Sequence, residues 1–137
     1  MSRFVRPETV TLPLSDGDSI IVRRWLTEGE SRDAHSLMYR EGHDGKMIVN
    51  PAEIGISMVL AYLLDWSLCD DDGRQVIIRD QPVEVVRAAL RQLHREDFEE
   101  LYSAIIAHEI RETAARADEK KTLRGALASE LISRSVA

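Results

Sequence analysis

The feature that most constrains the chain is an apolar segment that begins at Asn50 and Pro51 and extends to about Leu68. Asn50 is a favoured helix N-cap, and proline suits the first position of a helix, where no backbone N–H is needed. Apolar side chains surround most of the helix predicted over 51–68, and its polar residues form one narrow stripe. A helix of this kind is buried on most sides, so the remaining elements must pack around it.

Residues 9–24 predict an N-terminal β-hairpin. Val10, Leu12 and Leu14 alternate with threonine or proline, which is the period of two expected of a half-buried strand. The Asp16-Gly17 pair that follows is a strong turn signal, because both residues tolerate positive φ. A second, β-branched run then returns to Arg24. The short Val-Ile-Ile run at 76–78 is a candidate third strand.

Three further helices are predicted around this core. Thr27 and Glu30 form a capping-box pattern that starts a helix over 28–40, and a glycine-rich loop follows at 42–45. Pro82 starts a helix over 82–93, and an acidic first turn, which the helix dipole favours, starts another over 95–121. The fold class is therefore α+β and predominantly α-helical, with the hairpin packed on a bundle of about four helices. Residues 1–121 are expected to form a single globular domain.

The segment 122–137 differs from the rest of the chain. Leu123, Leu127 and Leu131 recur every four residues, with Ile132 adjacent to the last of them, while Gly125 weakens the helical pattern. An isolated helix of about 15 residues is marginal in water. We expect an amphipathic C-terminal tail helix that is mobile alone and ordered against a partner, with these four residues as candidate partner-binding residues.

Composition excludes several classes of function. The 137 residues carry a formal net charge of −6, whereas domains that bind nucleic acid by neutralising phosphates are usually basic. The single cysteine, Cys69, excludes an internal disulfide. The apolar run at 54–64 is too short for the ~20 residues of a membrane-spanning helix. We therefore expect neither nucleic acid nor a membrane among the partners.

No motif in the sequence supplies catalytic chemistry. The run from His108 to Glu112 begins like a zinc-binding helix but has glutamate where the second histidine belongs, so a solvated helix surface is the favoured interpretation. The Asp70–Gly73 run fails as a calcium loop, because Arg79 stands where the bidentate glutamate is required. Nucleophile-elbow, phosphate-loop and dinucleotide patterns are absent. The sequence predicts a non-enzymatic chain with no metal or cofactor, which works by binding other proteins.

Several segments in order resemble one protein family. The hairpin runs Leu-x-Leu-Ser-Asp-Gly-Asp over 12–18, the apolar segment ends in Tyr-Leu-Leu-Asp-Trp-Ser-Leu over 62–68, and an Asp-Asp-Gly turn follows. A helix starting at Pro82 and an acidic helix around Asp97 and Phe98 come next. Together they resemble the tail assembly chaperones of long-tailed, non-contractile bacteriophages, over roughly residues 4–110.

The resemblance implies a small, largely helical holdase in the host cell cytoplasm that is absent from the mature virion. Its implied partners are the tape measure protein, which it coats, and the tail tube protein, which it recruits; self-association is a further expectation. Many such chaperones are also made in a longer, frameshifted form. The alternative is a structural virion protein, such as a head–tail joining or tail terminator component, but these usually carry more sheet. An enzyme and a transcriptional regulator are less favoured, since catalytic motifs and a basic recognition helix are lacking.

Overall fold

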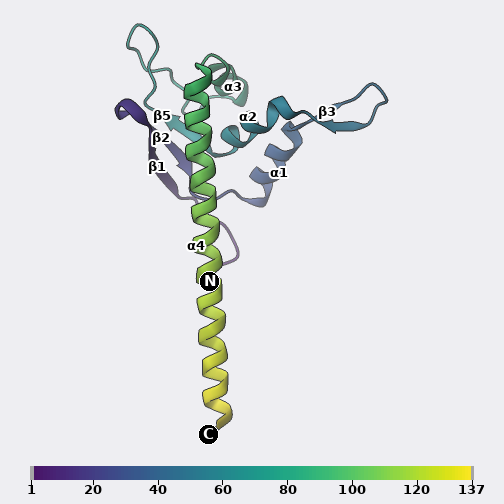
Figure 1. Cartoon of the computed structure of the whole chain (residues 1–137), viewed down its shortest axis with the longest axis vertical. Coiled ribbons are helices and arrows are strands. Elements are labelled where there is room, and N and C mark those ends of the chain that lie inside the picture. The colour runs from purple at the N-terminus through teal and green to yellow at the C-terminus, as the bar shows by residue number, and fades with distance from the viewer. Residues whose placement is uncertain (1, 137) are drawn as a thin grey trace.

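The molecule consists of a mixed α/β head from which one long helix projects (Figure 1). The computed structural model describes residues 2–136, with side chains described through residue 133. The head holds a three-stranded antiparallel sheet in the order β1-β2-β5 and, apart from it, a two-stranded sheet of β3 and β4. The α+β fold class predicted from the sequence is confirmed.

The N-terminal hairpin is present as predicted. Strands β1 (Thr9–Pro13) and β2 (Ser19–Arg23) pair antiparallel, with Leu12 opposite Ile20. The short 3-10 turn η1 (Ser15–Gly17) joins them, and its Asp16 and Gly17 both have positive φ, 57° and 79°. The Asp-Gly pair therefore makes the turn for the reason that the sequence suggested.

The third strand of the sheet is not at 76–78, as predicted, but at β5 (Leu63–Trp66), which pairs with β2. Helix α2 (Pro51–Tyr62) ends six residues before the predicted Leu68, because Leu63 adopts the extended conformation and the apolar run continues as a strand. The extended backbone of this run is stabilised by the ladder to β2. Residues 76–78 turn back beside it instead: the Val76 amide bonds the Leu68 carbonyl, and the Ile78 side chain enters the core.

The segment after α1 also differs from the prediction. Helix α1 (Glu28–Leu37) has the predicted capping box of Thr27 and Glu30, but it ends before Arg40. Strands β3 (Tyr39–Glu41) and β4 (Met47–Val49) pair as a second hairpin, and the predicted loop at 42–45 is its turn. We call residues 39–49 the arm, because they project from the side of the head (Figure 1).

The last two helices are α3 (Val83–Arg91) and α4 (Arg95–Val136). The sequence predicts a helix at 95–121 and a separate tail helix at 122–137, whereas α4 is one helix of 42 residues that continues through Gly125. At 1.5 Å per residue it is about 63 Å long. Gly125 has open space around it, so the helix loses only the small stability difference between glycine and alanine.

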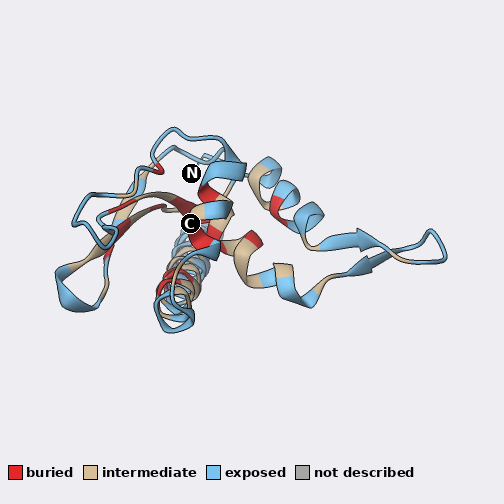
Figure 2. Ribbon diagram, turned by 90° about the horizontal axis from the view of Figure 1, so that it is seen from above, coloured by how far each residue is buried: buried red, intermediate tan, exposed pale blue. Residues whose placement is uncertain are grey.

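The core lies where the sheet, α2, α3 and the first half of α4 meet (Figure 2). Helix α2 contacts α1, α3 and α4, in agreement with the central position predicted for it. Its polar stripe is not wholly on the solvent side, because Ser57 is buried and its hydroxyl donates to the Glu53 carbonyl. The main buried residues are Leu12, Ile20, Val22, Val59, Tyr62, Leu63, Trp66, Ile78, Leu90, Leu101 and Ile105.

Two isoleucines of α4 provide a matched test of this packing. Ile105 is 0% exposed and Ile110, five residues later, is 65% exposed. We expect Ile105→Ala to lower the free energy of unfolding by about 2–5 kcal/mol, since it removes buried methyl groups and leaves a cavity. Ile110→Ala should change it by less than about 0.5 kcal/mol. Urea unfolding followed by circular dichroism measures both, and equal effects would contradict this assignment of the core.

Candidate protein-binding surfaces

A buried histidine fixes α4 against the end of the sheet. His108 is 1% exposed, and its Nε2 lies 3.1 Å and 3.0 Å from the carbonyl oxygens of Arg23 and Arg24. Because carbonyl oxygens only accept, Nε2 carries the proton and donates. The ring of Tyr62 meets the imidazole edge-to-face, with 6.0 Å between ring centroids. The solvated position predicted for His108 is therefore wrong, and its role is to join α4, α2 and β2.

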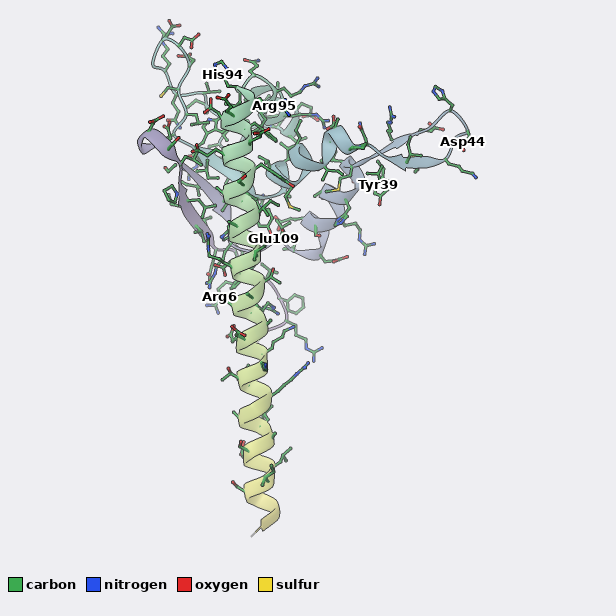
Figure 3. The ribbon with its side chains drawn as sticks, in the orientation of Figure 1. Arg6, Tyr39, Asp44, His94, Arg95 and Glu109 are labelled. Atoms are coloured by element: carbon green, nitrogen blue, oxygen red, sulfur yellow. The ribbon has the colours of Figure 1, made fainter. Side chains whose placement is uncertain are left out.

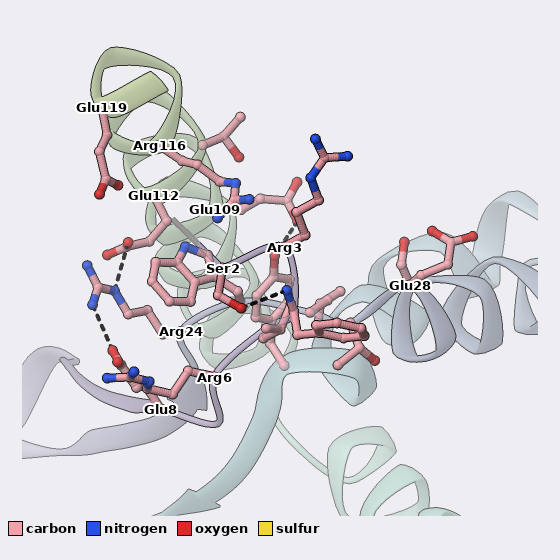
Figure 4. A pocket seen from close by; sticks show the side chains of 18 residues that line it. Ser2, Arg3, Arg6, Glu8, Arg24, Glu28, Glu109, Glu112, Arg116 and Glu119 are labelled. Carbon is pink, nitrogen blue, oxygen red and sulfur yellow. Dashed lines mark hydrogen bonds and ion pairs between the residues drawn. The ribbon is translucent and has the colours of Figure 1, made fainter. Parts of the chain in front are cut away.

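An ion-paired cluster continues this junction toward solvent (Figure 4). Arg24 donates to Glu8 at 2.7 Å and to Glu112 at 3.0 Å, and its guanidinium lies 4.2 Å from the ring centroid of Trp25. The hydrogen bonds to Glu8 and Glu112 raise the pKa of Arg24, so its charge is permanent. Glu112, considered above as a metal ligand with His108, is thus engaged by an arginine. Within the described residues, no group of histidine, cysteine and acidic side chains could hold a metal ion.

A pocket of about 580 Å³ opens beside this cluster, under the N-terminal residues 2–6. Tyr62 donates its hydroxyl to Glu109 at 2.7 Å on one wall. Burial, this hydrogen bond and the charge of Glu109 raise the pKa of Tyr62 above its ordinary value of 10.0, so the hydroxyl stays protonated. Several polar groups of its lining are paired with one another: Arg24 with Glu8 and Glu112, and Tyr62 with Glu109, which indicates a structural junction. Trp25 Nε1 is buried and has no hydrogen-bond partner in the described chain.

At the opposite end of the head, a carboxylate joins α4 to the first hairpin. Glu100 accepts from the Ser15 backbone N–H at 2.6 Å and from the Ser15 hydroxyl at 2.9 Å. These hydrogen bonds, the backbone one foremost, lower the pKa of the Glu100 carboxyl. The helix is therefore attached to the head near its start, at Glu100, and again from His108 to Glu112.

Beyond these attachments, α4 leaves the head. We call residues 117–136 the stalk; every side chain of 117–133 is exposed (Figure 3). The four candidate partner-binding residues all lie here, with Leu123 45%, Leu127 59%, Leu131 65% and Ile132 64% exposed. Leu123 follows the core residue Ile105 by 18 residues, which is five helical turns, so the leucine stripe continues the face with which α4 packs on the head. Ile132 lies about 100° around the helix from Leu131.

The arm is a second exposed surface, which the sequence analysis did not find. Tyr39, Met47, Ile48 and Val49 are all exposed large apolar residues. Tyr39 is opposite Val49, so these two side chains lie on one face of the arm, while Ile48 lies on the other. A two-stranded hairpin is marginally stable on its own, and this one is held to the head only at its base, where the Asn50 amide bonds the Met38 carbonyl.

The two tryptophans have different environments. Trp66 belongs to the core, and its Nε1 donates to the Val76 carbonyl at 2.7 Å. Trp25 is half-buried under the Arg24 guanidinium and faces the pocket at the junction. It therefore packs within the chain at the edge of the core.

Comparison with known proteins gives no assignment. The chain matches no family model, and neither the curated proteins nor the solved structures contain a significant match. None of the helices within residues 2–136 is long and apolar enough to pass through a bilayer. A function is therefore inferred from the exposed surfaces of the chain, chiefly the stalk and the arm.

The Glu100–Ser15 contact predicts a pH dependence of stability. A carboxyl whose pKa is lowered in the folded state stabilises it above the unfolded pKa, and this contribution is lost as pH falls through the folded pKa. Wild type should therefore be more stable than Glu100→Gln at pH 7, and the difference should shrink below pH 4.5, the ordinary pKa of a glutamate. Thermal unfolding between about pH 7 and pH 3 measures it; a constant difference would contradict the contact.

Proposed function

We propose that the chain is a tail assembly chaperone of long-tailed, non-contractile bacteriophages. It acts as a non-enzymatic holdase that binds the tape measure protein and recruits tail tube protein in the host cytoplasm. The observation that supports the proposal most is the stalk: a leucine stripe is held in solvent on a rigid helix. Contiguous exposed apolar residues mark surfaces that bind proteins.

The stalk suits a client made of long amphipathic helices. A helix that presents leucines every four residues packs along another helix by inserting its side chains between the ridges of the other. Because the stalk stands clear of the head, a client helix reaches the stripe without displacing any described element. Each fully covered leucine contributes roughly 1.5–3 kcal/mol to such binding. Binding then needs no catalytic residue, metal or cofactor.

Substitution of the stripe tests the proposal. In the full chain, Leu123→Gln, Leu127→Gln and Leu131→Gln together should weaken binding of the tape measure protein by at least about tenfold, since three apolar contacts are lost. Glutamine is nearly as good a helix former as leucine, so the stalk should stay helical. Co-expression with the tape measure protein of the same tail gene cluster, followed by measurement of its soluble fraction and of binding, provides the readout.

The matched control places glutamine elsewhere on the same helix. Thr122, Ser129 and Ser133 are exposed on the stalk but lie away from the leucine stripe. The triple variant Thr122→Gln, Ser129→Gln, Ser133→Gln should keep the tape measure protein soluble like wild type. A leucine triple variant that binds as tightly as this control would refute the role of the stripe. Recovery of the chain in purified virions would instead favour a structural tail component.

Removal of residues 122–137, which carry the leucine stripe, separates folding from client binding. A chain that ends at Lys121 should retain the cooperative unfolding of the head, because the buried residues lie before this point. It should nevertheless lose most of its affinity for the tape measure protein, or its self-association. Circular dichroism and binding measurements check both expectations. A truncated chain that binds a tape measure fragment as tightly as the full chain would show that the stalk has no such role.

A further inference from the structure

The arm carries an open strand edge that the proposed function does not use. Strand β4 is one of the two strands of its sheet, and its residues Met47, Ile48 and Val49 are 63%, 41% and 47% exposed. The arm projects from the head, with Tyr39 at its base and Asp44 near its tip (Figure 3). Both faces of β4 are apolar, because Met47 and Val49 point to one face and Ile48 to the other.

Strand β4 lacks the features that protect edge strands. Natural proteins place charged residues or proline on such strands, which keeps them from pairing with other chains. The other three edge strands of the described sheets each have one of these features: Pro13 in β1, Arg40 and Glu41 in β3, and Asp65 in β5. The sequence of β4 is Met-Ile-Val, without charge or proline. Its edge is therefore the least protected of the four.

The pairing of the arm determines which backbone groups of β4 point to the open edge. At the base of the arm, the Asn50 N–H donates to the Met38 carbonyl. Hydrogen-bonded pairs alternate with non-hydrogen-bonded pairs along an antiparallel ladder, so Ile48, two residues before Asn50, bonds to β3. The N–H and C=O groups of Met47 and Val49 consequently point away from β3, to the outer edge.

A second copy of β4 is complementary to this edge at every position. When two β4 strands run antiparallel about a two-fold axis at Ile48, Met47 of each copy lies opposite Val49 of the other, and Ile48 lies opposite Ile48. Each Met47–Val49 pair then exchanges both of its N–H···O bonds, and every opposed pair is apolar. The same arrangement of β3 would place Arg40 opposite Arg40, and like charges directly opposite destabilise a sheet.

Pairing also stabilises the arm itself. A two-stranded hairpin is marginally stable in water, whereas three or more strands with an apolar face are stable. Two arms joined through β4 form one sheet in the order β3-β4-β4-β3. On one face of it, Tyr39 and Val49 of one copy lie in a row with Met47 of the other.

We infer that two copies of the chain pair through the β4 strands of their arms, with the two-fold axis at Ile48. The contact uses the same surface of both copies, so it closes as a dimer. Because each copy contributes only a short strand, the contact is weak and reversible. It goes beyond the proposed function, since it needs no client and does not use the leucine stripe.

Single cysteines in the full chain test the register. Every variant carries Cys69→Ser, which removes the exposed native thiol. Ile48→Cys places two thiols across a non-hydrogen-bonded pair, with Cα atoms about 4.5 Å apart, so mild oxidation should link two chains by a disulfide. Met47→Cys alone, or Val49→Cys alone, places the thiols on a diagonal of about 7–8 Å and should crosslink at least about tenfold more slowly. An equimolar mixture of these two chains should crosslink, because positions 47 and 49 lie opposite each other.

A matched pair of proline variants tests the edge. Met47→Pro removes an N–H that points outward from β4 and leaves the ladder of the arm intact. Glu41 lies opposite Met47, so Glu41→Pro makes the same change at the outer edge of β3. In the Ile48→Cys chain, Met47→Pro should lower the yield of linked dimer by at least about tenfold, whereas Glu41→Pro should leave it unchanged. Circular dichroism verifies that every variant is folded.

Three outcomes would overturn the inference. The Ile48→Cys chain could stay monomeric under oxidation, which would leave the edge to a strand of another protein. Cysteine at 47 or 49 alone could crosslink as fast as cysteine at 48, which would indicate random collision. Met47→Pro could dimerise as well as Glu41→Pro. Association through the stalk does not produce this register, and no client is present, so a failure here leaves the holdase proposal to its own test.

Discussion

The attachment of α4 to the head is the interaction on which the rest of the structure depends. Leu101 and Ile105 fill the core, and His108 closes it by donating to the carbonyl oxygens of Arg23 and Arg24, at the end of β2. The imidazole is itself buried, and a buried polar group left unpaired costs about 1–3 kcal/mol, so these two acceptors hold it in place. The direction in which the rest of α4 projects from the head follows from this junction.

The sequence predicts the elements whose signals are local. The Asp16-Gly17 turn, the capping box at Thr27 and the helix start at Pro51 are each specified within a few residues, and each is present. The change from helix to strand after Tyr62 is different, because no glycine or proline marks it. Leu63 becomes extended because it pairs with Val22 of β2. Val22 lies 41 residues earlier in the chain, so the local sequence around Leu63 does not reveal this pairing.

The candidate binding surfaces also differ in whether a local sequence pattern predicts them. The leucine stripe is visible in the sequence because its spacing repeats along one helix, whereas the arm depends on the pairing of two short strands that carry weak signals. His108 was misassigned for a related reason, since its acceptors belong to Arg23 and Arg24.

The unbroken course of α4 has a mechanical consequence. From Glu112, the last residue of α4 described as paired with the head, to Val136 the helix extends about 36 Å, and it contains no proline and no break. A rotation of about 5° at Glu112 would therefore carry the tip through about 3 Å. Small changes in the packing between α4 and the head would therefore produce large displacements of the end of the stalk and of any protein bound there.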